Sequence, residues 1–131
     1  MTQLELLLAL WWLASTNMER REFLGNVVST TLSASLSNTA TSISLTDGST
    51  FPTGSSDKFV IVIDRGTINE EKILIASRST NTLTASSRGY DGIVAVAHNS
   101  GATVDHILDA TSVQDMNTTT YDTQVLLWVG I

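Results

Sequence analysis

Two side chains of this sequence, both of them histidines, could titrate near neutral pH. His98 lies in a turn-like stretch and His106 in a predicted strand, eight positions later. A helical zinc pair needs histidines at positions i and i+4, which this spacing does not provide. We therefore interpret both as structural histidines that are held by hydrogen bonds.

Carboxylates form the second group of side chains that could do chemistry. They could converge as calcium ligands, or two of them could act as a general acid and base in one cleft. Their spacing matches no calcium-binding loop, so we expect them at solvated loop and strand ends. The residues in this group are Asp64, Glu70, Glu71, Asp91, Asp105 and Asp109.

Other catalytic motifs are missing from the sequence. It contains no Gly-x-Ser-x-Gly elbow, no Gly-x-x-x-x-Gly-Lys phosphate loop and no Gly-x-Gly-x-x-Gly between a strand and a helix. Ser, His and Asp are present, but a triad is defined by geometry and not by composition. The absence of cysteine removes disulfides, thiolate metal sites and cysteine nucleophiles. We predict a protein that is not an enzyme and that uses neither a metal nor a cofactor.

Length and charge limit the remaining classes of protein. The 131 residues suit one domain. A net charge of −6 with only seven Lys and Arg argues against sequence-independent binding to the phosphates of nucleic acid. We therefore do not expect nucleic acid as a partner. Only 15% of the residues are charged, so Ser, Thr and Asn cover much of the predicted surface. This surface favours extended strands and association with further copies or neighbouring proteins.

Residues 1–26 are predicted to form an apolar helical segment. Residues 4–14 are apolar apart from Glu5, and a helix that is apolar on nearly every face must be buried. It is too short to span a membrane at ~1.5 Å per residue, and it lacks the basic start of a secretory signal. The segment docks either on its own domain or on a neighbouring subunit. The predicted docking residues are Leu4, Leu7, Leu8, Trp11 and Trp12.

A second helical segment is predicted directly after this run. Thr16 and Glu19 have the spacing of a capping box, which would begin a helix that continues to Leu24 and ends before Gly25. Whether residues 1–26 form one helix or two stays open.

Residues 27–131 are predicted to form a β domain. Residues 59–63 are a continuous apolar run, which predicts a central strand covered on both faces. Residues 71–77 and 82–86 would continue it as an antiparallel meander. Further short strands are expected at residues 30–36, 41–45, 102–108 and 123–129. About seven short strands with frequent turns indicate a small antiparallel β-barrel or sandwich.

An ordered series of short motifs runs from Thr31 to Leu108. The series reads Thr31-Leu32, residues 41–45, Phe51-Pro52, Glu71, residues 81–84, Arg88-Gly89-Tyr90-Asp91-Gly92 and residues 98–104. In this order and spacing it resembles a small β module that recurs in structural proteins of tailed phages. Ile93 stands where the module has Thr, and the apolar N-terminal run is not part of it.

The resemblance implies a structural protein of the virion, assembled in the host cytoplasm. Its place would be the capsid surface, as a decoration or cement protein or a fibre base, with a tail, neck or baseplate component as the alternative. The implied partners are other virion proteins and further copies of this chain, without nucleic acid or membrane. A carbohydrate- or receptor-binding module is the alternative from another class. Its aromatic platforms would be Trp11, Trp12, Tyr90, Tyr121 and Trp128.

The motif residues of the module are predicted to fix a loop. Gly89 and Gly92 allow backbone angles that are closed to other residues, and Arg88 could tie the loop to carbonyls or to a carboxylate such as Asp91. His98 could bridge the next turn in the same way. The predicted structural network comprises Arg88, Gly89, Asp91, Gly92, His98 and Gly101.

Overall fold

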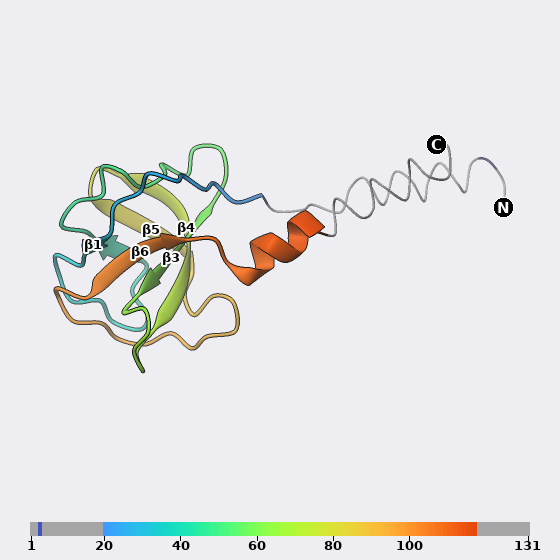
Figure 1. Cartoon of the computed structure of the whole chain (residues 1–131). Helices are drawn as coiled ribbons and strands as arrows, with labels where there is room; N and C mark the ends of the chain where they lie inside the picture. The colour runs from blue at the N-terminus through green and yellow to red at the C-terminus, as the bar shows by residue number, and fades with distance from the viewer. Residues whose placement is uncertain (1–2, 4–19, 118–131) are drawn as a thin grey trace.

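The described chain is built around an antiparallel sheet of six strands that is curled into a half-barrel (Figure 1). The computed structural model describes Gln3 and residues 20–117. The strands are β1 (Thr30–Thr31), β2 (Ser42–Ser44), β3 (Phe59–Ile63), β4 (Glu71–Ser79), β5 (Thr82–Ser87) and β6 (Thr103–Ile107). Their order across the sheet is β1-β6-β3-β4-β5-β2. The predicted fold class, mainly β with a barrel-like antiparallel sheet, is confirmed at this level.

Strand β3 lies inside the sheet, as the apolar run at residues 59–63 predicts. All five of its side chains are buried, and it pairs with β4 on one side and β6 on the other. Branched Val and Ile side chains suit this position because they pack well on a pleated surface. Alternate residues of β3 and β4 point into the curl and form the core together with residues from the outer strands. The core residues are Leu32, Leu36, Ile43, Leu45, Phe51, Phe59, Ile61, Ile63, Ile73, Ile75, Leu83 and Val104.

The meander β3-β4-β5 also agrees with the prediction. The register of β4 against β5 shifts twice between Leu74 and Ser77, which marks a bulge. Bulges bend a strand and increase its local twist, so this irregularity helps to curl the sheet.

The two outermost strands come together because the sheet curls. Leu32 and Leu45, just beyond β1 and β2, form an antiparallel bridge. Hydrogen bonds run beside it from Ser33 N to Ser44 O and from Thr46 N to Thr31 O, each 2.9 Å long. The expected strand at residues 30–36 is therefore a strand only at its start, and it continues as this bridge.

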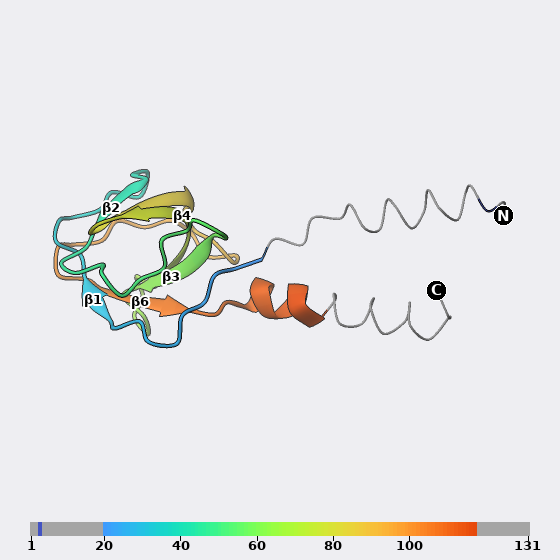
Figure 2. The same ribbon diagram turned by 90° about the horizontal axis from the view of Figure 1, so that it is seen from above.

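A helix at residues 110–117 follows β6, where no helix was expected. Asp109 begins it: the Ser112 hydroxyl donates to the Asp109 carboxylate, and Val113 N donates to Asp109 O at 3.2 Å. Asp109 thus stands at the N-cap position, although its carboxylate accepts from a side-chain hydroxyl and not from a backbone N–H group. It is 2% exposed, which corrects the expectation of a solvated carboxylate at this position. The helix points away from the β domain, on the side where the described chain begins at residue 20 (Figure 2). None of the described helices is long and apolar enough to cross a membrane.

The N-terminal part corrects one prediction and leaves others open. Residues 20–24 are not helical, so the predicted helix to Leu24 is wrong over these positions. Their backbone bonds to the β domain instead, with Glu22 N donating to Lys58 O at 2.8 Å and Leu24 N donating to His106 Nε2 at 3.2 Å. The apolar helix at residues 4–14 and the strand expected at residues 123–129 lie outside the described residues.

Candidate functional site

A buried glutamate stands at the centre of the polar residues of the domain. Glu71 is the first residue of β4 and pairs with Ile63, the last residue of β3. It is fully buried, which corrects the expectation of a solvated carboxylate. The reason is the alternation of side chains along a strand: Glu71, Ile73 and Ile75 share one face, and this face points into the core.

Arg88 neutralises this carboxylate with a two-pronged ion pair. Arg88 Nε donates to Glu71 Oε1 and Arg88 Nη2 to Glu71 Oε2, both at 2.8 Å. Its other N–H groups donate to Ser37 O and Ala40 O at 2.7 Å and to Val96 O at 2.8 Å. All five donors of the guanidinium are thus used. One side chain therefore joins β4 to the loop before β2 and to the loop before His98.

Backbone N–H groups complete the binding of the glutamate. Gly89 N donates to Oε1 of Glu71 at 2.9 Å, and Val96 N donates to Oε2 at 3.1 Å. Gly89 has φ 57°, and a Cβ atom there would lie 2.5 Å from Ile93 O. Backbone oxygen cannot move away as a flexible side chain could, so only glycine fits at this position.

His98 extends the network toward the surface. Its Nε2 lies 3.0 Å from Glu71 Oε2 and its Nδ1 lies 2.9 Å from Asp64 Oδ2. The His98 side chain is fully buried, whereas Asp64 is partly exposed. His98 and Leu36 also exchange both backbone hydrogen bonds, at 2.8 and 2.9 Å. The line Asp64, His98, Glu71, Arg88 thus runs from the surface into the core.

The charge state of Glu71 follows from these contacts. Burial alone would raise its pKa, but the hydrogen bonds from Arg88, Gly89, Val96 and His98 outweigh burial and lower the pKa from 4.5 to about 2. The carboxylate is therefore ionised at neutral pH and can only accept, so His98 Nε2 donates to it.

The geometry of this network suits fixing a structure rather than turning over a substrate. A general base or nucleophile needs a lone pair within reach of the substrate, and the Glu71 oxygens are buried and occupied by donors from the protein itself. A hollow of about 240 Å³ lies outside the network and reaches only its Asp64 and His98 end. Within residues 20–117, no three His, Cys, Asp or Glu side chains are grouped as a metal site requires.

The predicted network residues separate into two groups. Arg88, Gly89 and His98 meet at Glu71, but Asp91 does not join them. Asp91 binds Lys72 at 2.8 Å and Thr111 at 3.0 Å, and the hydrogen bond from Lys72 lowers its pKa. Arg88 thus reaches carbonyls, as one of the two expectations had it, and the carboxylate that it reaches is Glu71 and not Asp91.

The two remaining glycines shape turns at some distance from the network. Gly92 has φ 82° and Gly101 has φ 87°, and a Cβ atom at either position would meet open space. Their role is confined to the backbone angle. The predicted docking residues Leu4, Leu7, Leu8, Trp11 and Trp12, like Tyr121 and Trp128, lie outside the described residues.

His106 is held in a separate apolar setting. Its Nδ1 donates to Val60 O at 3.1 Å, its Nε2 accepts from Leu24 N, and its ring stacks on Phe23 with centroids 4.9 Å apart. Burial lowers the pKa of His106, and the hydrogen bond to Val60 opposes this effect only in part. Its neutral form satisfies both ring nitrogens.

Tyr90, the described member of the expected aromatic platforms, contacts its own chain. Arg21 Nη2 donates to the Tyr90 hydroxyl at 2.9 Å, and the Arg21 guanidinium carbon lies 5.8 Å from the ring centroid. This contact places the start of the described chain beside the loop that follows Arg88.

Sequence reasoning missed Glu71 and Asp64 as members of the network. For Glu71 a signal existed, because its position continues the alternation of Ile73 and Ile75 toward the core. Comparisons with protein-family models and with curated proteins returned no match to this chain. A proposal of function therefore depends on the series of sequence motifs and on the geometry of the residues in it.

Proposed function

We propose that this protein is a non-enzymatic structural component of a phage particle, in the role of a capsid decoration or cement protein or a fibre base. The observation that carries the proposal is the place of the motif residues. Glu71, Arg88, Gly89 and His98 belong to the ordered series that resembles the phage β module, and these same residues form the buried network. The series thus marks residues that hold a small domain together.

Such a network suits a protein that must stay folded in a particle. The chain has no cysteine, so disulfides cannot stabilise it. Arg88 instead ties the strand that carries Glu71 to carbonyls of Ser37, Ala40 and Val96. Hydrogen bonds in which the donor or the acceptor is ionised are roughly twice as strong as those between neutral groups. The working surfaces of the protein then lie outside the network.

The terminal segments are the proposed docking elements. The described chain begins and ends on the same side of the β domain (Figure 2), and the sequence beyond the beginning carries the apolar run at residues 4–14. In this proposal Leu4, Leu7, Leu8, Trp11 and Trp12 attach the domain to a capsid subunit, or to a tail, neck or baseplate subunit.

Immunogold electron microscopy tests the proposal on the protein as it exists. Antibodies raised against the full chain are applied to purified particles from the host that carries its coding sequence, with pre-immune serum as the control. We expect gold on intact particles. Label on heads supports the decoration role, and label on tails supports the alternative location. Full-length protein in the lysate together with unlabelled particles would contradict the virion role.

A further inference from the structure

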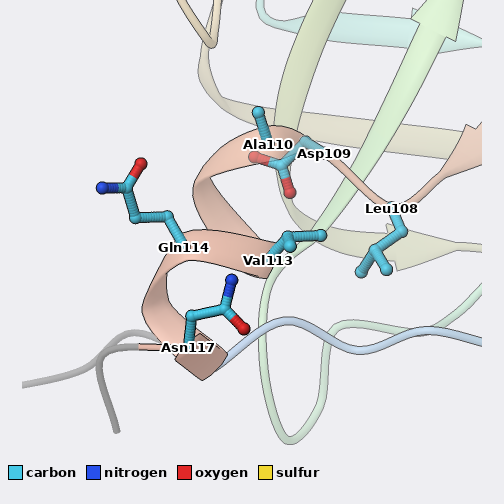
Figure 3. A pocket seen from close by; sticks show the side chains of 6 residues that line it. All are labelled: Leu108, Asp109, Ala110, Val113, Gln114 and Asn117. Atoms are coloured by element: carbon cyan, nitrogen blue, oxygen red, sulfur yellow. The ribbon is translucent and has the colours of Figure 1, made fainter. Parts of the chain in front are cut away.

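Two hollows of the described chain differ in the side chains that line them. The larger one, of about 490 Å³, lies beside the helix at residues 110–117, where the apolar side chains of Leu108 and Val113 are half-exposed (Figure 3). The smaller one, of about 240 Å³, lies between the turn that joins β3 to β4 and the loop that leads into β6. Its lining is mostly polar and comprises two alanines together with Asp64, Thr67, Asn69, His98 and Asn99. The smaller hollow is therefore the better candidate for a polar ligand.

Hydrogen bonds hold the walls of this smaller hollow in place. Asp64 N donates to Thr103 O at 3.0 Å, and Asp64 Oδ2 lies 2.9 Å from Nδ1 of His98, so the turn is joined to the loop. The Thr67 hydroxyl donates to Asp64 O at 2.8 Å and accepts from Asn69 N at 3.1 Å. A site that is already formed loses less conformational entropy when a ligand binds. The hollow is therefore preorganised.

Three side chains of the lining keep hydrogen-bonding groups that the described chain does not use. The side-chain amides of Asn69 and Asn99 are exposed and have no hydrogen-bond partner within residues 20–117. The Asp64 side chain is 25% exposed, and of its two carboxylate oxygens only Oδ2 is bonded to a described residue. An amide group both donates and accepts, whereas an ionised carboxylate only accepts. The hollow thus offers one acceptor and two groups that do both.

These groups select the chemistry of a ligand. A hydroxyl group donates and accepts, so neighbouring hydroxyls of one ligand can bond to the carboxylate and to the amides at the same time. An anion would be repelled by Asp64, and an ammonium group would leave the amide N–H groups without an acceptor. Among the described residues no Lys, Arg or aromatic side chain lines the hollow, so phosphates and flat aromatic ligands find no partner there.

The volume limits the size of the ligand. Sites for drug-sized ligands enclose roughly 300–1,000 Å³, and this hollow, at about 240 Å³, is smaller. It suits a ligand of about one sugar ring. Since such a ligand makes a few hydrogen bonds and has no aromatic ring to stack on, we expect a Kd on the order of millimolar.

We propose that this hollow binds one neutral polyhydroxylated ring, such as a single monosaccharide unit. Asp64 accepts from one hydroxyl, and the amides of Asn69 and Asn99 bond to its neighbours. The site is distinct from the aromatic platforms expected for a carbohydrate-binding module, because none of those residues lines it. This inference does not depend on the phage role, since it rests on the geometry of the hollow alone.

An NMR titration of the full chain tests the proposal. Methyl α-glucopyranoside, methyl α-mannopyranoside and methyl β-galactopyranoside are added separately, into the millimolar range, to isotope-labelled protein. We expect saturable shifts with at least one of these sugars, confined to the backbone and side-chain amides around the hollow, at residues 64–69 and 97–102. The absence of a saturable shift with all of them would overturn the proposal, as would shifts that lie elsewhere in the domain.

A double variant removes the two free amides and leaves the fold in place. Asn69→Ala combined with Asn99→Ala should weaken the binding of the sugar several-fold, because the hydroxyls lose these partners. The melting curve should stay that of the parent, since neither amide bonds to a described residue. The matched control is Asn38→Ala, which removes an exposed asparagine outside the lining and should leave the Kd unchanged. Equal affinity of the double variant and the parent would reject the assigned contacts.

Calcium chloride and sodium phosphate serve as probes for ions in the same titration. Shifts at residues 64–69 and 97–102 with either salt, but with none of the sugars, would assign the hollow to an ion and refute the proposal. Gold-labelled particles from a protein whose hollow binds no sugar would support the virion role and reject this inference.

Discussion

Replacing Glu71 with Gln removes the charge at the centre of the buried network and keeps the shape of the side chain. The Arg88 guanidinium then lies buried without its counter-ion, since its remaining partners are carbonyl oxygens. Breaking a buried ion pair by removing one partner is strongly destabilising, at about 3–5 kcal/mol. We expect Glu71→Gln to lower the free energy of unfolding at pH 7 by an amount of this order.

The pKa of Glu71 gives an independent value and a direction with pH. A pKa lowered from 4.5 to about 2 corresponds to roughly 3 kcal/mol of stability at neutral pH, at about 1.4 kcal/mol per unit. Because the folded pKa lies below the unfolded one, this contribution is complete above pH 4.5 and is lost as the pH falls toward 2. About 2 kcal/mol of it is gone at pH 3 by the same relation. The difference between the parent and Glu71→Gln should therefore shrink by that amount.

Urea unfolding followed by circular dichroism at pH 7 and pH 3 measures both quantities. The matched control is Glu70→Gln, one position earlier, where the carboxylate accepts from Gly66 N in an exposed turn. Comparing the two variants at each pH removes the titration of the other carboxylates. Equal stability of the two variants at pH 7 would refute the reasoning, and so would a gap between the parent and Glu71→Gln that is the same at both pH values.

Three further predictions address single contacts of the domain. Arg88→Lys should destabilise the fold by about 2 kcal/mol or more, because three donors replace five and the bidentate pair is lost; a melting curve equal to that of the parent would contradict this. Gly89→Ala should cost clearly more than Gly92→Ala, since only the first Cβ meets backbone, 2.5 Å from Ile93 O, while both lose roughly 1 kcal/mol to the backbone angle; equal urea midpoints would argue against the close approach. His106 should titrate below 6.5 by NMR because burial lowers its pKa, so its contribution to stability is complete above 6.5 and is lost as the pH falls; a midpoint at or above 6.5 would disprove this.

The strands were predictable where the signal is local. Residues 59–63 are apolar throughout, and only an interior strand buries such a run on both faces, so the position of β3 follows from five adjacent residues. The turns on either side of β4 are short, which makes an antiparallel meander the simplest path. This part of the fold can therefore be predicted from local composition.

The site was predictable only in part, because its central contacts join distant residues. The motif at Arg88 and Gly89 indicated a loop held by a guanidinium. That the carboxylate is Glu71, seventeen positions earlier, depends on the register of β4 in the curled sheet. A glutamate at the start of a strand is usually solvated, so the residue type alone predicted exposure to solvent where the structure shows burial.

The predictions of helical segments were wrong for a different reason. A helix after Thr16 was predicted from a capping box, but the backbone at residues 20–24 bonds to the β domain instead. The helix at residues 110–117 begins after Asp109, whose carboxylate accepts from the Ser112 hydroxyl, whereas the sequence placed Asp109 at the end of a strand. Capping signals are short and occur often, so tertiary contacts decide which of them begin a helix.

The bridge between Leu32 and Leu45 has a consequence for how copies of this protein can associate. The outer strand of a sheet normally offers free N–H and C=O groups to which another chain can add as a further strand. Here the backbones beside β1 and β2 bond to each other through Ser33, Ser44, Thr31 and Thr46, so these groups are already used within one molecule. Growth by strand exchange or amyloid-like stacking is disfavoured at this seam, even where many copies are crowded together.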